Sequence, residues 1–407
     1  MTMQRIWQIL LHKGIIVALA TAIPLLSMHA ETVADSVGDV RVSLVELSGQ
    51  PRVYAAYGHV SVRLEYPAGG LDFIASYEMD TSLGEIIKFF LGSVNAGWSV
   101  VPTALYMEQW QSRGRSMITH ELNLTDSEKR RLWRQLDKGA AEGYVHPYDY
   151  MHNMCSTMAI KAVDRALDKG SQLEWNNLRH EVQGTSREAF LYSSRHHRWA
   201  GFFWQTFLGI EGDRNATTME NLSPELLLEA IPKANIRSRD GEERPLIVAT
   251  QEVLPARGDA THVLDSPSPT MFFTVVLLVV IAFTLLEMKY RNRLLRLTGK
   301  VVDGVLIAVH LLLSLFFTYY VLFSHLVGSL WSWYVVPFNI IVPWLVALLL
   351  WRSHRRMVVG IYTAVVVVFF MLTPFIPQVD LPHQLFLAIF LVRLLKTSFA
   401  KTFERAE

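Results

Sequence analysis

Tyr57-Gly58-His59-Val60-Ser61-Val62-Arg63 opens the stretch that decides the fold, and its alternation of side chains continues to Tyr66. Successive side chains of a strand point to opposite faces, so this stretch predicts a half-buried strand with two distinct faces. The apolar face carries Val60, Val62, Leu64 and Tyr66, and the polar face carries His59, Ser61, Arg63 and Glu65. His59 therefore lies on the polar face of the strand, where it is not needed to pack a hydrophobic core.

A second stretch, Tyr148-Asp149-Tyr150-Met151-His152-Asn153-Met154-Cys155-Ser156-Thr157, contains the only cysteine of the chain. Breaks at Gly143 and Pro147 precede it. From about Asn153 to Leu167 the pattern is helical, and Lys169-Gly170 follows as a stop signal. Cys155 is therefore expected in the first turn of a helix.

The predicted helix has one face of small residues. Cys155, Ala159, Ala162 and Ala166 are spaced by four, seven and eleven positions and share that face. Small side chains let a helix lie close to a sheet, so we expect the thiol of Cys155 to meet the imidazole of His59. The alternative is a plain buried helix in which the cysteine is an apolar filler.

The surrounding elements complete an α+β domain over residues 31–235. Strands are expected near 40–47, 71–77 and 116–124, and a helical stretch near 83–91. Thr125-Asp126-Ser127-Glu128 forms a capping box, which predicts a helix through Lys138.

Cys155 and His59 are the candidate catalytic residues. A free thiol has a pKa of about 8.5, and both a helix N-terminus and a nearby imidazolium lower it toward the reactive thiolate. The backbone N–H groups at the helix start can also stabilise an oxyanion. Glu65, Asp72, Glu78 and Tyr57 are the candidates for a third group that orients His59, and the sequence does not rank them. No metal cluster or nucleotide loop is found, so no cofactor is expected.

The N-terminus resembles an export signal. Arg5 and Lys13 precede the apolar stretch from Gly14 to Leu26, whereas Met28-His29-Ala30 matches a cleavage site poorly. Residues 1–30 are therefore interpreted as a signal peptide or an N-terminal anchor. A lone thiol in an oxidising compartment is a liability unless it is used or protected.

The second half of the chain is predicted to be a membrane domain at residues 270–396, after a linker at 236–269 and before a cytoplasmic tail at 397–407. Five apolar stretches lie near 271–286, 301–323, 333–351, 357–373 and 383–395. Lys and Arg gather between the first and second stretches, between the third and fourth, and in the tail. The positive-inside rule then places the α+β domain outside, in the periplasm against a bacterial inner membrane.

Several polar residues in and near the spans allow two interpretations. Asp303 and His310 share a face of the second span, and Asn339 lies between two prolines, where helix-to-helix hydrogen bonds are a sufficient explanation. The basic, aromatic segment at residues 194–199 either touches lipid phosphates or is a solvated helix end. A net charge of +1 without a basic stripe argues against a nucleic-acid partner.

The order of histidine first and cysteine second resembles the circularly permuted branch of the NlpC-type and papain-like thiol superfamily, which includes relatives of lecithin:retinol acyltransferase. Beyond these two motifs, further segments resemble the Lnb family: Gly114-Arg115, Glu121 to Thr125, Asp213 to Thr217, Leu222 to Leu226, and Val302 to His325. The family usually has Phe at the position of Tyr57 and Asn at that of Met154.

The resemblance implies a permuted papain-like (NlpC-type) thiol domain followed by an all-α membrane domain of about five helices. It also implies lipoprotein N-acyltransferase activity, with a phospholipid as acyl donor, a Cys thioester as intermediate and the N-terminal amine of a diacylglyceryl-Cys apolipoprotein as acceptor. The alternatives are an NlpC-type peptidoglycan amidase or endopeptidase, and a non-enzymatic membrane assembly factor.

Overall fold

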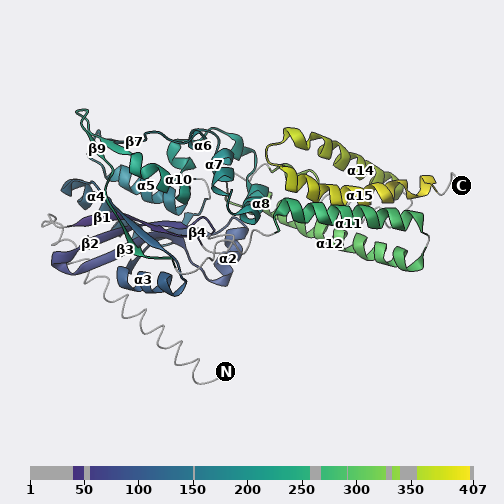
Figure 1. Cartoon of the computed structure of the whole chain (residues 1–407), viewed down its shortest axis with the longest axis horizontal. Helices are drawn as coiled ribbons and strands as arrows, with labels where there is room; N and C mark the ends of the chain where they lie inside the picture. The colour runs from purple at the N-terminus through teal and green to yellow at the C-terminus, as the bar shows by residue number, and fades with distance from the viewer. Residues whose placement is uncertain are drawn as a thin grey trace, which may run out of the picture.

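The computed structural model describes residues 40–49, 56–149, 152–256, 267–290, 292–326, 332–339 and 355–403. A mixed α/β part comes first and a helical part follows, and the two lie end to end with α8 (Arg198–Phe207) between them (Figure 1). The predicted signal peptide or anchor at residues 1–30 lies outside the described residues.

A seven-stranded antiparallel sheet forms the centre of the α/β part. Its strand order is β10-β5-β1-β2-β3-β4-β6. The strands are β1 (Arg41–Leu47), β2 (His59–Tyr66), β3 (Leu71–Met79), β4 (Asn95–Pro102), β5 (Met117–Leu122), β6 (His146–Pro147) and β10 (Ile247–Leu254). The four predicted strands are confirmed as β1, β2, β3 and β5, and the alternating stretch is the strand between β1 and β3.

Helices cover both faces of this sheet. The predicted cysteine helix is confirmed as α5 (Cys155–Ala166), and it packs with α4 (Asp126–Glu142) on the apolar face of β2. The alanines predicted to face the sheet are fully buried. The capping box opens α4, which continues four residues beyond the predicted end at Lys138. On the other face, α3 (Thr103–Ser112) covers a smaller apolar cluster.

The prediction of a linker at residues 236–269 is wrong for its first half, because that half forms β-strands. Besides β7 (Gln172–Glu174), a three-stranded sheet contains β8 (Asn235–Arg237) and β9 (Glu243–Pro245), and β10 joins the main sheet beside β5. As an edge strand held by backbone pairing, β10 keeps most of its side chains exposed, so it lacks the apolar signature of a core strand. Residues 257–266 lie outside the described ranges.

The helical part contains α11 (Pro269–Lys289), α12 (Arg293–Phe323), α14 (Arg355–Leu372) and α15 (Leu381–Phe403). By length and composition, α11 and α12 can cross a membrane. The first two predicted spans are thus confirmed as apolar helices, and the last two are helices α14 and α15. Most of the predicted third span lies outside the described residues, so a total of five stays a prediction.

Polar residues inside the helical part pair between helices. Arg393 of α15 donates to Asp303 at 2.7 Å and to Glu287 at 2.9 Å, and Lys396 pairs with Glu287 at 2.6 Å. His310 instead contacts the Tyr362 hydroxyl at 3.1 Å. Asp303 and His310 therefore have different partners, which agrees with the interpretation of these residues as helix-to-helix contacts.

Candidate active site

His59 is the first residue of β2, and this end of the strand contacts the start of α5. Its Nε2 atom lies 2.7 Å from Ser76 Oγ of the neighbouring strand β3. Ser76 is brought there by the register, in which Val62 pairs with Ala75 and therefore Ser61 faces Ser76. Because Nε2 is engaged with Ser76, Nδ1 is the ring nitrogen available to the thiol.

Cys155 is the first residue of α5 and is 7% exposed. Its thiol is hydrogen-bonded to the His59 side chain and accepts from the backbone N–H groups of Val60 and Ser156. The residue before it, Met154, makes no side-chain cap on the helix. Since Met154 does not cap the first turn, the N–H groups at the helix start are available to the sulfur or to an oxyanion.

The thiol and the imidazole stabilise each other's charged forms. Burial favours the neutral forms, but the charge and hydrogen bond of Cys155, together with the charge of Glu78, raise the pKa of His59 above its ordinary value. Burial likewise opposes the thiolate, yet the charge and hydrogen bond of His59 and the two backbone N–H groups lower the pKa of Cys155. The arrangement favours a thiolate beside an imidazolium.

Glu78 is the carboxylate that reaches His59. Ser76 Oγ donates to Glu78 Oε2 at 3.2 Å, and Ser99 Oγ donates to Glu78 Oε1 at 2.5 Å. The other predicted candidates have different partners. Glu65 pairs with Arg41 and Arg63, Asp72 binds Arg63 and Thr103, and the Tyr57 hydroxyl contacts Ser194. The chain His59, Ser76, Glu78 thus supplies the third group, and Ser76 was not predicted.

An aromatic layer joins this site to the helical part. Tyr148 is half-buried beside Cys155, where the loss of hydration and then the thiolate charge raise its pKa. Its ring lies 5.6 Å from that of Phe89, which lies 5.4 Å from Trp204 of α8. Phe207 of α8 then contacts Tyr320 of α12 at 5.2 Å. The buried thiol is therefore linked by packed rings to a helix of membrane-spanning length.

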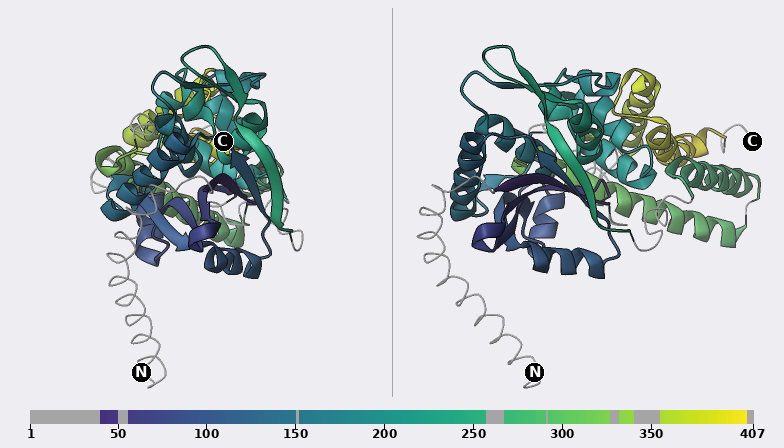
Figure 2. Two further views of the ribbon diagram at one scale, coloured as in Figure 1. Left: turned by 90° about the vertical axis from the view of Figure 1, so that its left-hand side faces the viewer. Right: turned by 60° about the vertical axis from the view of Figure 1, so that its left-hand side comes forward.

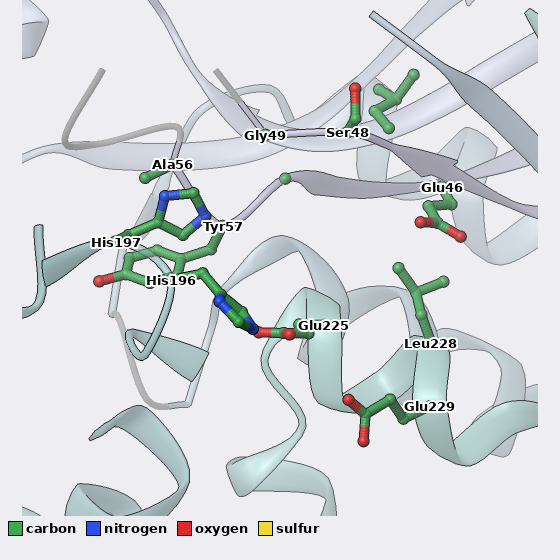
Figure 3. Close-up of a pocket in the computed structure, with 12 residues that line it drawn as sticks. Glu46, Ser48, Gly49, Ala56, Tyr57, His196, His197, Glu225, Leu228 and Glu229 are labelled. Carbon is green, nitrogen blue, oxygen red and sulfur yellow. The ribbon is translucent and has the colours of Figure 1, made fainter. Parts of the chain in front are cut away.

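A cavity of about 350 Å³ is lined by Tyr57 and Gly58, the two residues that precede His59, and by His196 and His197. Figure 3 shows His197 over the ring of Tyr57, and His196 beside Glu225. Both histidines come from the predicted basic, aromatic segment, in which Arg195 also pairs with Glu225 at 2.6 Å. Trp199 packs against Phe272 and Phe273 of α11. The segment thus forms a pocket wall and contacts α11, while its His196 and Arg198 remain exposed.

Within the described ranges, no group of three or more His, Cys, Asp or Glu residues is placed to hold a metal ion.

These features define a class of protein: an α/β domain that holds a thiol–imidazole pair, joined to helices long and apolar enough to cross a membrane. Residues 32–184 match the family described as the Lnb N-terminal periplasmic domain, so this part of the chain belongs to the Lnb family. Both His59 and Cys155 fall inside the match. The match and the apolar helices α11 and α12 together indicate a membrane protein with an Lnb-type periplasmic domain. No curated protein and no solved structure matches it. The permuted papain-like fold stays a prediction.

Proposed function

We propose that the protein is a thiol-dependent lipoprotein N-acyltransferase of the bacterial inner membrane. The observation that carries this proposal is the contact between the Cys155 thiol and the His59 imidazole at the start of α5. Family membership and the aromatic layer between the thiol and α12 support a substrate that resides in the bilayer.

In the first half-reaction, the Cys155 thiolate attacks the carbonyl carbon of a phospholipid acyl ester. The backbone N–H groups at the start of α5 stabilise the tetrahedral oxyanion. When the C–O bond breaks, the His59 imidazolium gives its proton to the leaving lysophospholipid oxygen. The products are a thioester on Cys155 and a neutral His59.

In the second half-reaction, the amine of the apolipoprotein N-terminal cysteine attacks the thioester carbonyl. His59 accepts a proton from the attacking nitrogen as the C–N bond forms. The C–S bond breaks, the thiolate leaves, and an amide-linked acyl chain remains on the lipoprotein. Glu78 acts through Ser76 as a positioning group, because its charge favours the imidazolium.

Cys155→Ser is expected to abolish N-acylation because it removes the nucleophile. His59→Ala removes the general base and is expected to lower the rate of N-acylation by at least about a hundredfold. The measurement is mass spectrometry of lipoprotein N-terminal peptides from a strain that lacks other N-acyltransferases. Membrane insertion should be unchanged, as fractionation would show. Fully N-acylated lipoproteins in either mutant would contradict the proposal, and muropeptide release by the wild-type protein would favour an amidase instead.

A further inference from the structure

Helix α2 (Leu83–Phe90) presents an apolar surface to the outside of the molecule. Its buried side carries Phe89, which packs against the aromatic layer of α8. On the opposite side, Leu83 and Ile87 are 75% and 52% exposed, and Lys88 lies beside them. Residues four apart lie on one face of a helix, so the two apolar side chains form a single exposed patch.

The end of α2 is fixed to the end of α12. The backbone N–H of His325 donates to the Gly92 carbonyl at 2.8 Å, and Ser324 Oγ donates to the same oxygen at 3.3 Å. Gly92 has a φ of +65°, and a Cβ there would meet Ser324 Oγ at 2.2 Å. The junction therefore requires glycine, and it holds the C-terminal end of α2 beside the C-terminal end of α12.

The length of α12 indicates where its C-terminal end would lie relative to a bilayer. Its apolar stretch from Val301 to Phe323 rises about 34 Å at about 1.5 Å per residue, which is close to the hydrocarbon thickness of about 30 Å. Phe323 and Leu322 are themselves 59% and 65% exposed. The exposed apolar end of α12 therefore lies beside the C-terminal end of α2, the helix that carries the exposed Leu83 and Ile87.

We propose that α2 is an interfacial helix that inserts Leu83 and Ile87 into the periplasmic leaflet of the phospholipid bilayer. A lipid surface is the occupant because α2 adjoins the exposed apolar end of a span, and because Lys88, which pairs with Glu85 at 2.6 Å, borders the patch. A lysine at such a depth buries its stem and places its ammonium among the phosphates.

One consequence concerns the route of the acyl donor, and it rests on the proposed function. Phe89 on the inner side of α2 contacts Tyr148, which adjoins Cys155. A phospholipid that leaves the bilayer beside α2 would reach the thiol through these rings, without crossing the polar surface of the domain.

The test uses the single cysteine of the chain. In full-length protein with Cys155→Ser, the variants Leu83→Cys and Ile87→Cys each place one thiol on the outer side of α2. Leu105→Cys, on α3 of the same domain, is the matched control because Leu105 is 58% exposed. Each variant is labelled with an environment-sensitive fluorophore and reconstituted into phosphatidylethanolamine and phosphatidylglycerol vesicles.

At positions 83 and 87 we expect blue-shifted emission and several-fold stronger quenching by nitroxide lipids than at position 105. Emission at 83 and 87 that matches position 105, with equal quenching by aqueous iodide, would overturn the proposal. The readout needs no acyl transfer. A failed transferase assay of the wild-type protein, with lipid quenching of the labelled variants intact, would contradict the proposed function and leave the position of α2 standing.

Discussion

Cys155 and His59 keep each other charged, and this mutual effect sets the pH range in which the thiol reacts. Although burial opposes both charged forms, the charge of each group acts on the other, so that the pKa of Cys155 is lowered and that of His59 is raised from their ordinary values. Alkylation by iodoacetamide should therefore persist at pH values where a free cysteine is protonated, and decline as the pH falls through the lowered pKa. In His59→Ala, the profile should move toward that of a free thiol, with a loss of about tenfold or more near pH 7. Identical pH profiles of alkylation in the wild type and in His59→Ala would contradict the interaction between His59 and Cys155.

Glu78 should control the upper limit of activity. Its charge raises the pKa of His59, so the imidazolium that protonates the leaving group survives to higher pH. In Glu78→Gln, the alkaline limb of the rate profile for acyl transfer should move to lower pH, and kcat should fall by about tenfold, the equivalent of one pKa unit. KM should change little, because the Glu78 carboxylate contacts Ser76 and Ser99 and acts on the thiol only through His59.

Asp72→Asn is the matched control for Glu78→Gln. Both carboxylates lie on the same face of β3, but Asp72 binds Arg63 and Thr103 rather than the His59 network. The control should leave the pH profile in place. An equal shift in both variants would mean that general charge, rather than the path through Ser76, acts on His59.

At the scale of single elements, local sequence predicted much of what positions the site. The alternation after Gly58 predicted β2, and the spacing of Cys155 and its alanines predicted the buried face of α5. Ser76 was missed because its role depends on the register between β2 and β3, and a single sequence does not encode which residues of two strands face each other.

Two further elements show why pattern alone was insufficient. The strand β10 is stabilised by pairing with β5 and leaves most side chains in solvent, so its composition resembled a linker. The basic, aromatic segment 194–199 suggested lipid or solvent contact, whereas its Trp199 packs against Phe272 and Phe273 of α11. Both outcomes depend on contacts between segments far apart in the chain.

For the whole molecule, the proposed acyl transfer requires the thiol to stay at a fixed height above the bilayer. The α/β part and the helices meet at α8 (Figure 1), and the right-hand view of Figure 2 shows the helices extending away from the α/β part. Gln205 Nε2 donates to the Pro377 carbonyl at 3.0 Å, and Thr206 Oγ1 lies 2.9 Å from His383 Nε2. The ring of Phe202 stacks on His383 at 4.2 Å. These contacts restrain the domain far more than a flexible tether would.

Gln378 provides the sharpest test of that restraint. Its fully buried amide donates to the Thr206 carbonyl at 3.0 Å and accepts from the Trp333 backbone N–H at 2.9 Å. Gln378→Met keeps the volume but leaves both groups unpaired, at a cost of about 1–3 kcal/mol each. Amide hydrogen exchange in α8 should accelerate by about ten- to a hundredfold, since each 1.4 kcal/mol of opening free energy is about tenfold. Acyl transfer should fall while the alkylation rate of Cys155 stays unchanged.

Gln384→Met is the control, because the Gln384 amide donates to the Val379 carbonyl within its own segment at 3.2 Å. Its exchange in α8 should match the wild type. If Gln378→Met accelerates exchange in α8 but leaves acyl transfer intact, the height of the domain does not limit the reaction. If both variants slow alkylation of Cys155, the substitutions disturb the thiol site itself, and a separate restraining role for α8 is contradicted.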